Sequence, residues 1–169
     1  MNELAEVLVV DDIDSLFRVH YGRLVRALTV VSGSREAAED AVQMAFVKAH
    51  LRWRRIRRYD DPVGWIRRVA INNLHDENRR NVSKHRATER MANEQRHEVM
   101  LWSDGADVAT MLAELPRQQR LSVALFYVDG MSVAEVADAL SISVGAVKFH
   151  LHQGRERLRG TFLNGEPHE

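Results

Sequence analysis

The sequence contains no cysteine, and this absence removes several kinds of chemistry. A chain without thiols forms no disulfide, no thiolate metal site and no cysteine nucleophile. Long hydrophobic runs are absent too, since none reaches the roughly 18 residues needed to span a bilayer. Residues 1–4 lack the basic region that opens a signal peptide. We therefore expect a cytoplasmic protein with no membrane association.

Proline is scarce, with only three in 169 residues, and strand-like alternation is almost absent. Helical periodicity dominates, which predicts an all-α fold. The length and the 45% hydrophobic content suit one or two small domains. We expect two small helical domains joined by a polar linker, the C-terminal one containing a helix-turn-helix.

Helix start and stop signals divide the chain further. Asp12, Ser34 and the pair Asp61-Pro62 are expected to begin helices, and Gly33 to end one. Helices are predicted over about 13–31, 35–53, 62–81, 107–114, 117–128, 132–140 and 144–159, with a connector at 54–61. The expected organisation is a tail at 1–12, a first domain at 13–83, a linker at 84–106, a second domain at 107–163 and a tail at 164–169.

The net charge is zero, but the charges are unevenly distributed. Residues 51–90 contain 12 Lys/Arg and 5 Asp/Glu, a net of +7, between acidic stretches on both sides. Such a basic block can offer an anionic ligand one local surface on a neutral protein. The basic block is explained equally well by a solvent-exposed, arginine-rich face that binds no ligand.

Residues 132–159 have the pattern of a helix-turn-helix. Ser132 and Glu135 form a capping-box pattern, and an apolar stripe follows over residues 133–140. After a short turn at 141–143, the next helix has an apolar side and an opposite side with basic residues at i, i+4, i+7 and i+11. That side carries Lys148, His152, Arg155 and Arg159, with Gln153 beside it. We expect this helix to enter a major groove, although a helical hairpin with a solvated basic face gives the same pattern.

The helix predicted over 35–53 is unusual in having two faces that are not simply apolar and polar. Small and apolar residues from Ala38 to Ala49 gather on one side. The far side mixes polar and apolar side chains: Asp40, Gln43, Met44, Val47 and Leu51. A partly apolar surface of this kind is usually covered, either by a partner protein or by another helix of the same domain.

The helix predicted over 62–81 is expected to bury Trp65, Ile66, Val69 and Ala70. Another side of this helix carries polar residues at the same i, i+4, i+7, i+11 spacing: Arg68, Asn72, His75 and Arg79. Further candidate DNA-contacting residues lie beside them, namely Asn73, Arg80 and the preceding Tyr59. Arginine supplies phosphate contacts, asparagine suits a base edge, and an aromatic ring can stack on an unpaired base.

Together these segments resemble the extracytoplasmic-function (ECF) sigma factors of bacterial RNA polymerase. Residues 40–49, DAVQMAFVKA, resemble the polymerase-binding helix, and residues 62–72, PVGWIRRVAIN, the segment that recognises the −10 element. Residues 115–137 resemble the start of the −35-binding domain, and residues 144–158 its recognition helix. The order and spacing of these motifs, separated by a polar linker, make the resemblance specific.

The resemblance implies partners and roles. The domain at 13–83 would be sigma region 2, and the one at 107–163 sigma region 4. Asp40 and Gln43, with Met44, Val47 and Leu51 around them, would contact the β′ clamp of core polymerase, and the second domain the β flap. Asn72 would help hold a base flipped from the single-stranded −10 element, and residues 54–61 would form the specificity loop. Lys148, Phe149 and His152 would face the duplex −35 element. An anti-sigma factor is a further partner, and no enzyme activity, metal or cofactor is implied.

Two other functions compete with this interpretation. Residues 7–12, VLVVDD, resemble the first strand of a response-regulator receiver domain, but Asp60 and Asp61 do not follow a second buried strand as an acceptor aspartate would. A helix-turn-helix repressor would bind duplex DNA without polymerase, commonly as a dimer. An enzyme is the weakest alternative, because His150 and His152 at i, i+2 do not share a helical face and make a poor metal site.

Overall fold

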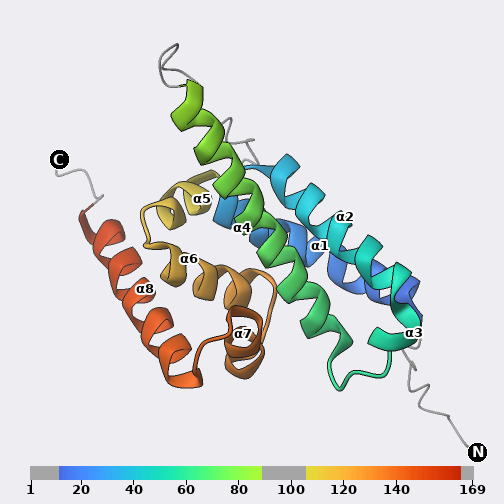
Figure 1. Ribbon diagram of the computed structural model, residues 1–169. Coiled ribbons are helices and arrows are strands. Elements are labelled where there is room, and N and C mark those ends of the chain that lie inside the picture. The colour runs from blue at the N-terminus through green and yellow to red at the C-terminus, as the bar shows by residue number, and fades with distance from the viewer. Residues whose placement is uncertain (1–11, 89–105, 165–169) are drawn as a thin grey trace, which may run out of the picture.

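The computed structural model describes residues 12–88 and 106–164, and within these ranges every regular element is helical (Figure 1). The N-terminal half contains α1 (Ile13–Ser32), α2 (Arg35–Leu51), α3 (Trp53–Ile56) and α4 (Pro62–Thr88). The C-terminal half contains α5 (Ala106–Ala113), α6 (Arg117–Val123), the π-helical turn η1 (Ala124–Val128), α7 (Val133–Leu140) and α8 (Val144–Asn164). The predicted all-α class is confirmed.

The caps that the sequence predicts begin and end the first two helices. The Asp12 Oδ1 accepts a hydrogen bond from the Asp14 amide at 3.3 Å, and the Ser34 Oγ accepts one from the Ala37 amide at 3.2 Å. Gly33 takes the left-handed conformation at φ 72° between them, which residues without a Cβ adopt at no steric cost. The helix boundaries here lie within two residues of those predicted.

Two boundaries in the N-terminal half differ from the prediction. Asp61 does cap α4, with its Oδ1 accepting from the Gly64 amide at 2.8 Å. The helix then runs to Thr88 rather than ending near residue 81, because residues 82–88 contain neither proline nor glycine to stop it. The predicted connector at 54–61 begins as a helical turn, α3, before the chain bends into α4.

The helix expected over 117–128 is interrupted. In η1 the Asp129 amide donates at 3.2 Å to the carbonyl of Ala124, five residues earlier, so this helical turn contains one residue more than an α-helical turn. Gly130 then changes the direction of the chain, with φ at 79°. The predicted capping box of α7 is present in both directions, since Ser132 and Glu135 bond each other's main-chain amides. The last helix extends to Asn164, past its predicted end near 159.

The two halves are distinct helical groups, yet they pack directly against each other. In Figure 1, α4 runs diagonally across the molecule in front of α1, with α2 on one side of it and α5 to α8 on the other. Helix α1 contacts η1 and α5, and α4 contacts α7. The sequence predicts two domains on a tether, and it contains no signal for this close contact.

The segment from Ile13 to Ile56 is helical apart from two short turns, which contradicts a receiver domain. The strand that the receiver interpretation places at residues 7–12 lies almost wholly outside the described residues. Among the described helices none is both long and apolar enough to cross a membrane.

Candidate protein-binding and nucleic-acid-binding surfaces

Helix α2 has the two faces that its sequence predicts. Its inner face is buried against α1 and α4: Ala38, Ala41, Val42, Ala45, Phe46 and Ala49. On its outer face Met44 is 52% exposed, Val47 53% and Leu51 78%, and Asp40 and Gln43 are exposed as well. No described helix covers this face, so the alternative that another helix of the same domain packs on it is wrong. We call Met44, Val47 and Leu51 the outer apolar stripe.

A groove of about 280 Å³ lies beside the outer apolar stripe, between α1 and α2. Phe17 stacks on Tyr21 with ring centroids 4.5 Å apart and meets Phe46 edge-on at 5.1 Å. The Gln43 amide donates to the Tyr21 hydroxyl at 3.2 Å, which fixes its direction at the rim. Phe17, 41% exposed, belongs to this surface but was not predicted. The only sequence signal for the role of Phe17 in this surface is its position one helical turn after Ile13, which places the two side chains on the same side of α1.

Helix α4 places its predicted DNA-facing residues in different surroundings. Asn72 is exposed, whereas Asn73 turns toward α2, where its amide donates to the Ala41 carbonyl at 3.0 Å. The Asn73 Oδ1 also accepts from the Lys48 Nζ at 2.9 Å. The hydrogen-bonding groups of Asn73 are therefore used within the fold, and of the two asparagines Asn72 is the exposed one.

Two of the polar residues lined up along one side of α4, Arg68 and His75, face the C-terminal half. The Arg68 Nε donates to the Asp138 carbonyl of α7 at 3.2 Å. His75 is half-buried, and its burial, followed by the nearby charge of Arg117 on α6, lowers the pKa of its imidazole. Arg79, by contrast, remains largely exposed.

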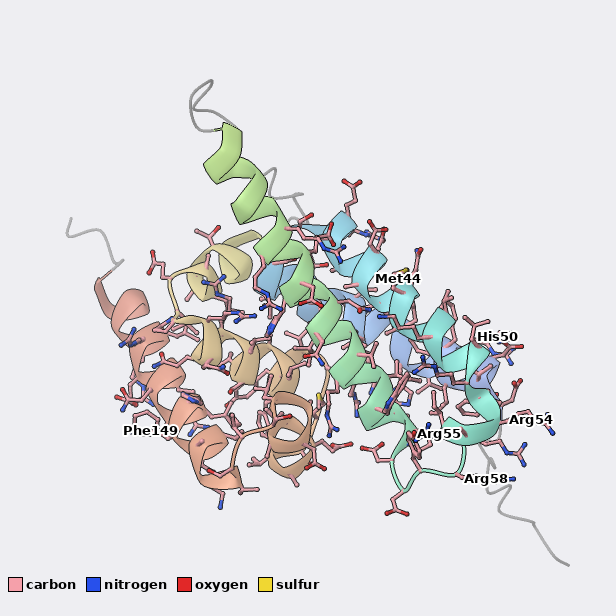
Figure 2. The ribbon with its side chains drawn as sticks, in the orientation of Figure 1. Met44, His50, Arg54, Arg55, Arg58 and Phe149 are labelled. Atoms are coloured by element: carbon pink, nitrogen blue, oxygen red, sulfur yellow. The ribbon has the colours of Figure 1, made fainter. Side chains whose placement is uncertain are left out.

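The basic connector forms the corner before α4. Arg54, Arg55 and Arg58 lie at this corner, and all three are exposed (Figure 2). Tyr59 follows them with 37% of its surface exposed. Arg79 forms a 2.5 Å ion pair with Asp76, while Arg80 is exposed. The predicted basic surface is therefore open at this corner and at the later turns of α4.

Helix α8 presents the predicted outward stripe. Lys148, Phe149, His152 and Arg155 are exposed, and Gln153 is half-buried. The inner side is closely packed, since a Cβ on Gly154 would lie 2.8 Å from a Val123 methyl group. Phe149 is 58% exposed and labelled on α8 in Figure 2.

One residue beside this stripe escaped the sequence prediction. Tyr127 of η1 is 55% exposed, and its hydroxyl accepts a hydrogen bond from the Arg155 Nη1 at 3.2 Å. This contact fixes the direction of Arg155. It follows from the widened turn of η1, which helical periodicity alone does not indicate. In the parts of the chain that the structure describes, no group of three or more His, Asp or Glu side chains could hold a metal ion.

Comparisons with known proteins agree with this geometry. The family model for sigma-70 region 2 matches residues 16–83, and that for sigma-70 region 4 matches residues 106–158. The ECF RNA polymerase sigma factor SigM of Mycobacterium tuberculosis is 32% identical over 146 residues, which cover 86% of this chain and 74% of SigM. The chain belongs to the ECF sigma factors. The resemblance predicted from the motifs is thereby confirmed.

Two further comparisons place this ECF sigma factor among its relatives. The sigma factor SigE of Mycolicibacterium smegmatis is 29% identical over 156 residues, and the match spans 60% of its length. A solved structure of the sigma factor RpoE from Bartonella quintana, in complex with the anti-sigma factor NepR, superimposes with a TM-score of 0.76 at 20% identity. It covers 93% of this chain and 100% of RpoE, so the likeness in fold includes both halves.

Proposed function

We propose that this ECF sigma factor binds core RNA polymerase, directs it to promoters with −10 and −35 elements, and helps to open the DNA. The observation that carries the proposal is the outer face of α2, which stays exposed and partly apolar while the inner face fills the core. Binding to DNA alone does not require an exposed, partly apolar helix face, whereas binding to another protein does. Its family membership supports the same function.

The polymerase contact is the outer face of α2. Asp40 and Gln43 supply polar contacts to the β′ clamp, and the outer apolar stripe supplies area to bury. Since Gln43 is already oriented by Tyr21, it loses little side-chain freedom on binding. The second domain adds a contact to the β flap.

The −10 contact combines α4 with the basic connector. Asn72 is placed to hydrogen-bond a base removed from the stack, and Tyr59 to stack on one. Arg79, Arg80 and the connector arginines supply phosphate contacts. Arg68 is exposed and can join this surface although its Nε donates to the Asp138 carbonyl, whereas the half-buried His75 faces the C-terminal half. Asn73 positions α4 on α2 rather than contacting DNA.

The −35 contact is the outward stripe of α8. Lys148 and Arg155 meet phosphates or guanine edges, and Phe149, His152 and Gln153 lie where bases are read. Tyr127 holds Arg155 in position. This is the docking of a helix-turn-helix whose second helix enters the major groove.

The mechanism needs binding energy and no covalent chemistry. Capture of an unstacked base and the displaced strand offsets an unpairing cost of a few kcal/mol. Each DNA contact is weak alone, and polymerase turns the two into one avid contact by fixing their separation. The protein therefore acts in the cytoplasm as an initiation subunit and not as an enzyme. An anti-sigma factor is a further partner, as NepR is for the Bartonella RpoE.

Association with core polymerase tests the proposal. Purified core enzyme is titrated onto the labelled protein and its Gln43→Ala variant, with Gln118→Ala, an exposed glutamine of α6, as the matched control. We expect the wild type and Gln118→Ala to bind equally and Gln43→Ala to bind more weakly with an unchanged melting temperature. Equal binding by all three would remove Gln43 from the contact, and no binding at all would reject the function.

A further inference from the structure

Helix α8 carries a large apolar side chain where water favours a polar one. Phe149 is 58% exposed, which makes it the most exposed aromatic residue in the part of the chain that the structure describes. Val147 and Leu151, two residues to either side and about 200° around the helix, are 0% and 3% exposed in the core. Phe149 therefore points almost directly away from the body of the C-terminal half.

The position of Phe149 along α8 is set by the start of the helix. The Ser143 Oγ accepts a hydrogen bond from the Ala146 amide at 3.1 Å, and this bond caps the first turn. Phe149 is the sixth residue of α8, so it lies in the second turn. In a helix-turn-helix, the N-terminal residues of the second helix contact the base edges. Phe149 therefore lies in the part of α8 that meets the bases.

The surface beside Phe149 leaves its ring accessible. A helical side chain covers the turn that precedes its own Cα, and one turn before Phe149 the chain has Gly145, which carries no side chain. A Cβ built on Gly145 would meet only the Ser143 Oγ, at 3.8 Å, so the space over that turn is open. The His150 ring meets the Phe149 ring edge-on with centroids 5.7 Å apart, which restricts the directions that the Phe149 ring can take.

The other outward side chains of α8 are polar. Lys148 and His152 are exposed on either side of Phe149. Glu156, two turns further along, is exposed as well, and Arg159 pairs with it at 2.9 Å. An isolated apolar ring among polar side chains lacks the contiguous apolar area of a protein-binding surface. The surroundings of Phe149 therefore favour contact with DNA over contact with another protein.

One feature of the major groove matches an exposed phenyl ring. Thymine presents its 5-methyl group there, whereas the other three bases present hydrogen-bond donors and acceptors. A phenyl ring makes no hydrogen bond to these donors and acceptors, and covering them leaves them unsatisfied. Against thymine, by contrast, the ring and the methyl group remove each other's apolar surface from water. Phe149 should therefore favour thymine over the other bases.

We infer that Phe149 is a specificity-determining residue of the −35 contact and reads the 5-methyl group of a thymine in that element. The inference rests on the proposed function, because it requires α8 to enter the major groove. It goes further by naming the base that this helix selects. The thymine methyl group should improve Kd about fourfold, which is roughly the contribution of one buried CH₂ group.

Deoxyuridine tests the inference, because it differs from thymidine only in lacking the 5-methyl group. A pool of duplexes with a random central segment is first selected for binding to the full chain. Each thymidine of the selected sequence is then replaced in turn by deoxyuridine. Every duplex is titrated with the wild type, Phe149→Ala and Tyr127→Ala. Tyr127 is the matched control, since it is an aromatic residue of the same half with a similar exposure, 55%.

We expect one thymidine position at which deoxyuridine weakens wild-type binding about fourfold. Phe149→Ala should bind the thymidine and deoxyuridine duplexes equally at that position. Tyr127→Ala, which removes the partner of Arg155, should weaken the binding of both duplexes by the same factor and keep the fourfold difference. Thermal melts of both variants should match the wild type within a few degrees, because both side chains are largely exposed.

The outcomes separate the inference from the function on which it rests. Selected sequences that share no thymine, or in which no deoxyuridine weakens binding, overturn the inference and leave the −35 contact standing. A deoxyuridine effect that keeps its full size in Phe149→Ala also overturns it, because another residue then reads the methyl group. If the wild type enriches no sequence, the −35 function fails and the role of Phe149 fails with it. Phe149→Gln, a polar residue with good helix propensity, replaces Phe149→Ala if that variant melts early.

Discussion

Shortening the outer apolar stripe should weaken polymerase binding by an amount that its exposure determines. Leu51→Ala removes three carbon atoms, each worth about 0.8 kcal/mol when buried. Since 78% of Leu51 remains exposed, complete coverage by the polymerase gives a loss of about 1.9 kcal/mol, roughly 20-fold in Kd. Val47→Ala removes two carbons at 53% exposure, a loss of about 0.8 kcal/mol or roughly fourfold.

Val19 provides a matched control for this experiment. It is 54% exposed on α1, almost as much as Val47, but lies about 200° around the helix from Phe17 and the groove. Core polymerase is titrated onto each labelled variant, and thermal melts are recorded beside the titrations. We expect Val19→Ala to bind as the wild type does, and all three variants to keep their melting temperature within a few degrees.

Two results would refute this reasoning. If Leu51→Ala and Val47→Ala bind as tightly as Val19→Ala, the outer apolar stripe is not the polymerase contact. If they lower the melting temperature strongly, these side chains support the fold and their exposure has been misjudged.

Three further perturbations have defined outcomes. Burial lowers the pKa of His20 and of His75 from 6.5, so the folded protein favours their neutral forms. The protein should therefore lose stability as the pH falls below about 6.5. Thermal melts between pH 7.5 and 5.5 should show this loss, and a variant with both histidines changed to asparagine should lose less stability over the same range. Gly154→Val forces a side chain against α6, where even a Cβ would lie 2.8 Å from a methyl group, and should reduce the free energy of unfolding by about 1–3 kcal/mol in urea titrations. Lys148→Ala should reduce the slope of log Kd against log salt for duplex DNA by about one, whereas Arg26→Ala on α1 should leave that slope unchanged.

Much of the fold could be predicted because local signals were strong. Asp12, Gly33, Ser34 and the capping box at Ser132 each fix a helix end through one or two main-chain hydrogen bonds, which depend on neighbours only a few residues away. The two faces of α2 were predictable for the same reason, because helical periodicity assigns each residue to a side. The end of α4 was misplaced because polar residues 82–88 weaken the pattern without breaking the helix.

The contact between the halves could not be predicted, because it depends on residues far apart in the sequence. Arg67 resembles any other arginine of the basic block until Asp129 is placed beside it. Asp129 is buried and follows directly on η1, a π-helical turn for which the sequence has no strong local signal. Of the residues in the predicted −10 surface, Asn73 and His75 face other elements of the protein, which helical periodicity alone does not indicate.

Transcription from a genomic library tests the central claim most directly. Core polymerase alone, core polymerase with this protein, and core polymerase with its Asn72→Ala variant are supplied with bacterial genomic fragments, and the 5′ ends of the transcripts are mapped. We predict new start sites that share two sequence elements at a constant spacing, and their loss or strong reduction with Asn72→Ala. Start sites that remain identical to those of core polymerase alone would contradict the account.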